Sequence, residues 1–171
     1  MWQKAKSTRW LPVILILGCV TCADDRLSPN ARVDRVLVIK HERKLALLDH
    51  GKVLKEYKVA LGGDPSGPKT RRGDHKTPEG EYTLDHRNAH SQFYHSIHIS
   101  YPNARDRARA RRLGVAPGGD VMLHGLPNGY GWIGSRHRAR DWTDGCIAVT
   151  NQEMDQIWHA VPDGTAIEIR P

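Results

Sequence analysis

The sequence predicts a single, mainly β domain with a few short helices. Sixteen glycines and ten prolines in 171 residues favour many turns over a helical bundle. Short β-branched or alternating runs lie between these turn residues, which is typical of strands, and two stretches carry a helical pattern. Apolar residues make up 39% of the chain, which is enough for a hydrophobic core and excludes a disordered chain.

Residues 1–23 are interpreted as an export signal. Three basic residues, Lys4, Lys6 and Arg9, precede the apolar residues 11–17. This layout is typical of a secretion signal rather than of a permanent membrane-spanning helix. Removal of these three cations lowers the formal net charge from +7 to +4.

Two processing sites for this signal remain open. Residues 16–19, Ile-Leu-Gly-Cys, resemble a lipobox in which Cys19 carries a lipid anchor, whereas Ala23 ends an ordinary cleavage site. Either site places the folded part in the periplasm or the cell envelope. Residues 24–32 are interpreted as a polar linker, and residues 33–171 as the domain.

The first strands of the domain are expected to form a meander. The run 36–39 is followed by a polar turn and a return strand at 45–48, and a second turn leads into an alternating strand at 53–61. Residues 62–80 hold five glycines and three prolines, which predicts a long loop. Loops of this length in compact domains are usually functional or mobile.

The second half of the domain mixes strands with two helices. Strands are expected at 81–84, 96–100 and 121–123, and a helix over 104–113 with Asn103 as its N-cap. Thr150 begins a capping box with Glu153, and the spacing of the apolar residues that follow predicts a core-facing helix. An alternating strand at 165–169 closes the domain.

Cys146 and His124 are the candidate catalytic pair. Cys146 is the only thiol of the expected folded domain, and an unpaired thiol is unusual in an exported protein. A nearby imidazole can take the proton of a thiol and activate it. Gly145 allows a close backbone approach, so that main-chain N–H groups around it can hold an oxyanion. The alternative is that Cys146 only fills the core beside Ile147.

These residues lie in segments that resemble the YkuD-type L,D-transpeptidase family. His124-Gly125 is followed by seventeen residues and then by 143–146, Thr-Asp-Gly-Cys, which is similar to the His-Gly and Ser/Thr-x-Gly-Cys signature of the family. Residues 73–80 resemble its Gly-Asp-x-x-Thr-Pro-x-Gly loop, and 100–103 and 117–120 resemble a proteobacterial branch. The resemblance extends from about residue 33 to the last residue.

The resemblance implies a fold, a substrate and residue roles. The fold is a β-sandwich-like domain with the site at one end, and the substrates are peptidoglycan stem peptides. Cys146 is the nucleophile that carries the acyl group, and His124 is the proton donor and acceptor. No cofactor is implied.

Substrate recognition departs from the family pattern at one position. Many members carry Arg two residues after the nucleophile, where this chain has Ala148. A substitute cation is expected from the segment before Cys146, and the candidates are Arg136, Arg138 and Arg140. His98 lies in an expected strand and is a further candidate for substrate contact.

Other clusters of polar and aromatic residues carry weaker alternatives. Five histidines raise the alternative of a zinc peptidase, but the His-Glu-x-x-His signature is absent, so we expect no metal and mostly solvated loop positions. They are His86, His90, His95, His98 and His137. The basic helix at 105–112 is expected to be a solvated face, attractive to anionic envelope polymers rather than to nucleic acid. The aromatic residues Tyr130, Trp132 and Trp142 either line the cleft or cover the core.

The sequence therefore predicts an exported cysteine L,D-transpeptidase that acts on peptidoglycan through a thioester. The group that orients His124 stays open between Asp144 and a backbone carbonyl. Two alternatives remain for the function. One is an L,D-carboxypeptidase or amidase that hydrolyses peptidoglycan-linked peptides. The other is a noncatalytic wall-binding lipoprotein, which would have no need of a Cys/His pair.

Overall fold

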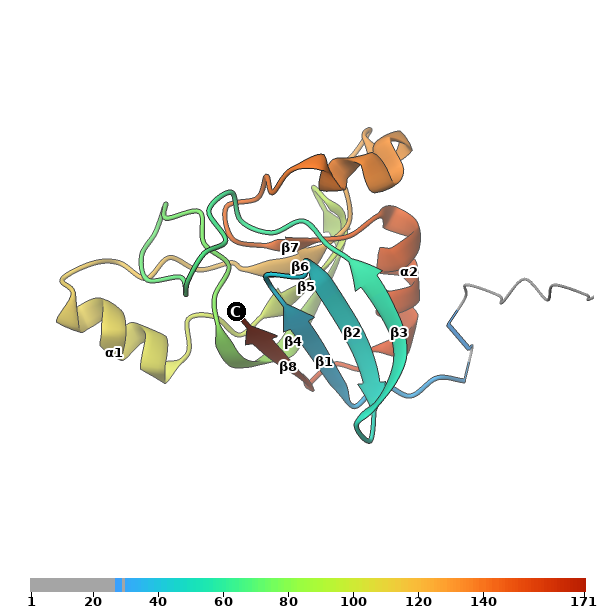
Figure 1. The fold of residues 1–171 in the computed structure, drawn as a ribbon, viewed down its shortest axis with the longest axis horizontal. Helices are drawn as coiled ribbons and strands as arrows, with labels where there is room; N and C mark the ends of the chain where they lie inside the picture. The colour runs from blue at the N-terminus through green and yellow to red at the C-terminus, as the bar shows by residue number, and fades with distance from the viewer. Residues whose placement is uncertain (1–26, 29) are drawn as a thin grey trace, which may run out of the picture.

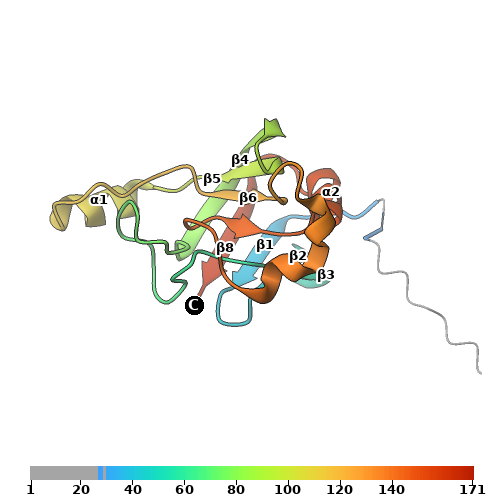
Figure 2. The same ribbon diagram turned by 90° about the horizontal axis from the view of Figure 1, so that it is seen from above.

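The computed structural model describes residues 27–28 and 30–171, which form an eight-stranded sheet in the order β3-β2-β1-β8-β4-β5-β6-β7. The strands are β1 (Arg35–Ile39), β2 (Lys44–Asp49), β3 (Lys52–Lys58), β4 (Gly80–Ser91), β5 (Tyr94–Ile99), β6 (Met122–His124), β7 (Ile147–Ala148) and β8 (Thr165–Arg170). The helices are α1 (Ala104–Arg112), the 3₁₀ segment η1 (Gly131–Ala139) and α2 (Asn151–Ala160). Helix α1 projects from the body on the side opposite α2 (Figures 1 and 2).

The sheet curls until its two edges meet. Ala60, just after β3, exchanges both backbone hydrogen bonds with Ala148 of β7, at 3.0 and 2.9 Å, and Gly62 pairs with Thr143. Because alternate residues of a strand point to the same face, the curl encloses one apolar face of the sheet. The enclosed side chains include Val36, Val38, Leu45, Leu47, Leu84, Ile97, Ile99, Leu123, Ile147 and Ile167. The predicted mainly β, sandwich-like domain is confirmed.

The two predicted helices are also present. In α2, the Thr150 side chain accepts from the N–H of Glu153, and the Glu153 carboxylate accepts from the N–H of Thr150, so the capping box is formed. Met154 and Ile157 are fully buried, as the apolar spacing predicted. In α1, Asn103 caps the first turn, and most of the arginines are exposed to solvent, as expected.

The prediction of mostly solvated loop histidines is wrong in two respects. His86 and His90 are exposed, but they lie in β4, which is longer than expected. His95 is half-buried and His137 is buried, both beside aromatic rings: the His95 ring stacks on Trp158 at 4.6 Å, and His137 contacts Trp142 at 6.5 Å between centroids. Trp158 is distant from His95 in the sequence, whereas Trp142 lies close to His137, and the polar residues around each histidine did not reveal either contact.

The long loop 62–80 is present and is held by a buried lysine. Lys40, at the end of β1, is 2% exposed, and its Nζ donates to the carbonyls of Gly67 and Thr77 and to Glu79 at 2.7–2.9 Å. Burial lowers the pKa of Lys40, and the bond with Glu79 works against this shift. These contacts fix the loop against the sheet.

The expected export signal at 1–23, with Cys19, lies outside the described residues. In the part that the structure describes, no helix has the length and apolar character needed to cross a membrane. Of the expected linker 24–32, Leu27 packs against the hydrophobic core.

Candidate active site

A cavity of about 440 Å³ has both candidate catalytic residues, Cys146 and His124, in its wall. It is bounded by the β4–β5 hairpin, by β6 and by the chain that leads into β7. The remaining lining residues are Asn88, Ser91, Gln92, Phe93, Ser96, Asp120, Met122, Trp142, Thr143 and Asp144.

Strand pairing sets the spacing between the thiol and the imidazole. Strands β6 and β7 are parallel, with Leu123 opposite Ile147, so Cys146 lies level with Met122. The Met122 N–H donates to Cys146 Sγ at 3.4 Å. His124 follows two residues later on the same face, which is roughly 6–7 Å along a strand. Both side chains therefore face the same cavity from neighbouring strands.

The orientation of His124 is fixed by a backbone carbonyl. Its Nδ1 lies 2.6 Å from Gly125 O, and because a carbonyl only accepts, Nδ1 carries the proton and Nε2 is the basic nitrogen. Asp144, the other candidate, pairs instead with His75 Nδ1 at 2.7 Å. Of the two groups that the sequence left open for the orientation of His124, the backbone carbonyl is therefore the one in contact with it.

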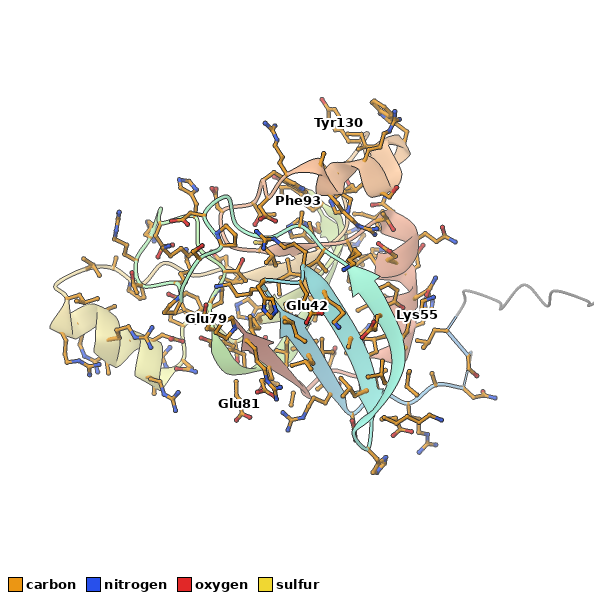
Figure 3. All side chains as sticks on the ribbon, viewed as in Figure 1. Glu42, Lys55, Glu79, Glu81, Phe93 and Tyr130 are labelled. Carbon is orange, nitrogen blue, oxygen red and sulfur yellow. The ribbon has the colours of Figure 1, made fainter. Side chains whose placement is uncertain are left out.

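Aromatic rings cover the His124 imidazole. The ring centroid of Phe93 lies 4.7 Å from that of His124, and the centroid of Trp142 lies 5.8 Å from it. Phe93 lies on the same side of the molecule as η1 and Tyr130 (Figure 3). Burial lowers the pKa of His124 to about 4, although the bond to the Gly125 carbonyl works against this shift. The imidazole is therefore neutral at pH 7.

The thiol of Cys146 is also uncharged in the resting site. Burial raises the pKa of Cys146, while the hydrogen bond from the Met122 N–H acts in the opposite direction. The S–H group is directed toward Asp120 O at 3.7 Å. The resting pair is thus a thiol beside a neutral imidazole rather than a preformed ion pair.

Gly145 is required by a close approach of two backbones. Its φ is +128°, and a Cβ at this position would lie 2.5 Å from Lys76 O. Its N–H donates to Thr143 Oγ1 at 3.1 Å, so its expected role as an oxyanion donor stays a prediction about the reacting state. Among the described residues, none accepts a hydrogen bond from the Cys146 N–H, so no protein group competes with an oxyanion for this donor.

Residues 33–169, which include both catalytic candidates, match the model of the YkuD family, described as the L,D-transpeptidase catalytic domain. The chain belongs to this family.

Relatives and solved structures agree with this assignment. YafK of Escherichia coli (strain K12), which carries a provisional L,D-transpeptidase name, is 32% identical over 133 residues, 74% of this chain and 46% of YafK. The crystal structure of Pgp2, a helical cell shape determining protein from Campylobacter jejuni, matches with a TM-score of 0.61 at 27% identity, over 82% of this chain and 48% of that one. The chain spans about half the length of each.

A more distant structure shows the shared fold alone. The L,D-transpeptidase from Xylanimonas cellulosilytica matches with a TM-score of 0.53 at 16% identity, over 81% of this chain and 61% of that one. The curled sheet of the present chain is therefore the YkuD fold.

In this YkuD domain a buried ion pair, which the sequence did not reveal, contacts the turn that precedes Cys146. Lys69 Nζ donates to Asp74 Oδ1 at 2.7 Å and to Asp144 O at 3.4 Å, and both side chains of the pair are nearly inaccessible. Burial alone would raise the pKa of Asp74, but Lys69 and three backbone N–H groups hold it at about 2. The Gly-Asp motif marked Asp74, whereas no sequence signal marked Lys69.

The three candidate arginines occupy different places. Arg138 forms an ion pair with Glu153 of the α2 cap and lines a different cavity from that of Cys146, so its contact with substrate stays a prediction. Arg136 and Arg140 line a largely apolar cavity of about 510 Å³. Trp142 lines both this cavity and that of Cys146, so the two adjoin.

The remaining candidates lie around the site rather than in it. His98 pairs with Asp85 at 2.7 Å and lines a cavity of about 580 Å³, which shares Asp120 with the Cys146 cavity. Its contact with substrate stays a prediction. Tyr130 lines the cavity that Arg136 and Arg140 also line. Trp132 is 71% exposed and belongs to neither cleft nor core.

None of the five candidate histidines joins a cluster of metal ligands in the described part of the chain. The side chains there that come close enough to share an ion are Asp34, Asp49 and His50, all outside the catalytic cavity. The position of these groups gives the zinc alternative no support.

Replacement of Gly145 by Ala tests the close approach. We expect Gly145→Ala to lower the free energy of unfolding by about 1–3 kcal/mol, because it adds a clash to a positive φ, and to abolish turnover. Urea denaturation and an activity assay measure the two effects. Gly119→Ala is the control, because a Cβ there meets no atom within 4 Å. Equal stabilities of the two variants would contradict the steric account.

The pH dependence of acylation tests the buried imidazole. His124 accepts a proton only when neutral, so the rate of acyl-enzyme formation should hold down to about pH 5 and fall toward its pKa of about 4. Single-turnover mass spectrometry from pH 4 to 9 measures this. The folded-state pKa lies below the ordinary value of 6.5, so stability also declines as pH falls below 6.5, and circular dichroism is the control. A half-maximal rate near pH 6.5 would exclude a buried neutral base.

Proposed function

We propose that this protein is an exported cysteine L,D-transpeptidase that acts on peptidoglycan stem peptides. The observation that carries the proposal is the placement of Cys146 and His124 in one cavity, with the basic Nε2 of His124 left to act on the thiol. Membership of the YkuD family supports the reaction class. The similarity to Pgp2, a helical cell shape determining protein, supports a role in shaping the cell wall.

The proposed first half of the reaction forms a thioester. His124 Nε2 takes the Cys146 thiol proton as Sγ attacks the carbonyl carbon of an L-to-D peptide linkage. The new oxyanion accepts a hydrogen bond from the Cys146 N–H, and from the Gly145 N–H once Thr143 releases it. His124 then donates its proton to the departing amine, the C–N bond breaks, and the acyl group remains on sulfur.

The second half of the proposed reaction transfers the acyl group. An acceptor amine attacks the thioester carbonyl and loses its proton to His124. The C–S bond then breaks, and the proton returns to the Cys146 sulfur. Throughout both halves the Gly125 carbonyl stabilises the imidazolium by accepting from Nδ1–H. Attack by water in place of the amine would give hydrolysis by the same steps.

Export is part of the proposal and rests on the layout of residues 1–23. Processing at Cys19 would give a lipid-anchored protein, and processing after Ala23 a free one. Both place the domain beside peptidoglycan, where the proposed substrate occurs.

The catalytic proposal is tested by product analysis with purified peptidoglycan fragments. The parent protein should form an acyl-enzyme and a crosslinked product, whereas Cys146→Ala should keep its fold and form neither. His124→Gln should slow acylation by roughly 10²–10⁴-fold, the range for loss of a general base. Mass spectrometry detects both species. Turnover by Cys146→Ala would end the proposal, and trimmed peptides without crosslinks from the parent would favour the hydrolase.

The placement of Arg136 and Arg140 predicts how the missing cation is replaced. We expect Arg136→Ala or Arg140→Ala to lower amine transfer about tenfold, the loss of one charge-assisted hydrogen bond, while thioester formation changes less. The ratio of crosslinked product to acyl-enzyme measures this. Arg111→Ala, on the exposed face of α1, is the matched control. Unchanged transfer in both cavity variants would contradict the substitution.

A further inference from the structure

Ser96 has a buried hydroxyl that the fold itself leaves unused. The residue is 2% exposed, and its Oγ has no hydrogen-bond partner among the described residues. A buried polar group without a partner costs about 1–3 kcal/mol. Buried hydroxyls are otherwise nearly always bonded, so this one calls for a partner that the folded chain does not supply.

The strand register directs Ser96 toward the catalytic cavity. In β5, Ile97 and Ile99 face the core, and Ser96 faces the opposite side. Ser96 pairs with His124 of β6 on one side and with Asn88 of β4 on the other. All three line the same cavity. The hydroxyl therefore lies between the catalytic base and a side-chain amide, with about 5 Å between neighbouring Cβ atoms.

Neither of the obvious structural roles explains the hydroxyl. Orientation of His124 is already provided by Gly125 O at 2.6 Å, on the Nδ1 side of the ring. Stabilisation of the fold requires a hydrogen-bond partner, which Ser96 lacks among the described residues. A contact with bound substrate remains.

We propose that Ser96 and Asn88 form a subsite for one backbone amide of the acyl-donor peptide. Asn88 Oδ1 is occupied by the N–H of His90 at 2.9 Å, so the Asn88 side chain offers its NH₂ group as a donor. The Ser96 hydroxyl can accept. A peptide amide presents one C=O and one N–H, which match the Asn88 NH₂ and Ser96 Oγ. The subsite is uncharged and rests on the proposed function, because it positions the donor beside Cys146.

The test separates binding from folding. Ser96→Ala should keep or raise the free energy of unfolding, since it removes an unsatisfied buried group, and should lower kcat/KM for acylation about tenfold, through KM. Thr165→Val is the matched control: its hydroxyl donates to Pro162 O at 2.7 Å, outside the catalytic cavity. This control should lose stability and keep kcat/KM.

A second measurement identifies the amide that is bound. In a series of donor peptides, each with one backbone amide replaced by an ester, one ester should acylate the parent more slowly than the all-amide peptide. The same ester should cause no further loss with Ser96→Ala. Equal kcat/KM values for Ser96→Ala and the parent, or parallel losses of stability and activity, would overturn the subsite alone. Absence of any acyl-enzyme in the parent would overturn the proposed function along with it.

Discussion

The position of Cys146, the proposed nucleophile, depends on the close contact between the loop 62–80 and the turn before β7. At two points these backbones approach closely: a Cβ on Gly145 would lie 2.5 Å from Lys76 O, and a Cβ on Gly62 would lie 3.1 Å from the Gly145 Cα. Two buried ammonium groups, those of Lys40 and Lys69, hold the loop in this position. Cys146 is therefore placed by backbone packing at the seam where the sheet closes.

Ala148, the position at which the sequence departs from the expected family pattern, lies in this seam. Ala148 is fully buried, and its backbone exchanges hydrogen bonds with Ala60 across the closing edges. A long cationic side chain at this position would have to leave a packed seam, whereas the segment of η1 lies outside it. Arg136 and Arg140 line a cavity that shares Trp142 with the Cys146 cavity, and their contact with substrate is part of the proposal.

The sequence predicted the features that leave a local signal. Alternation placed the early strands to within a few residues, the capping box placed α2, and the motif pair placed Cys146 and His124. Strand β7 has two residues, which are too few to show an alternating pattern. The second half of β4 is polar on both faces, so alternation of apolar and polar residues did not predict it. The contact of Lys69 with the Asp144 carbonyl and the stacking of His95 on Trp158 join residues that are distant in sequence, so only the folded chain brings them together.

The burial of the catalytic pair offers a reason why a free thiol is compatible with the proposed envelope location. Thiolates, rather than thiols, are oxidised and alkylated readily, and burial raises the pKa of Cys146. The same burial keeps His124 neutral and able to accept a proton. In the proposed reaction, negative charge develops on the oxygen of the substrate carbonyl, which then accepts a hydrogen bond from the Cys146 N–H. A site that excludes water strengthens this hydrogen bond. A bound peptide that fills the cavity also displaces water from the thioester, the condition for an amine to compete with water at about 55 M. Low resting reactivity of the thiol and the proposed transfer to an amine thus depend on the same packing.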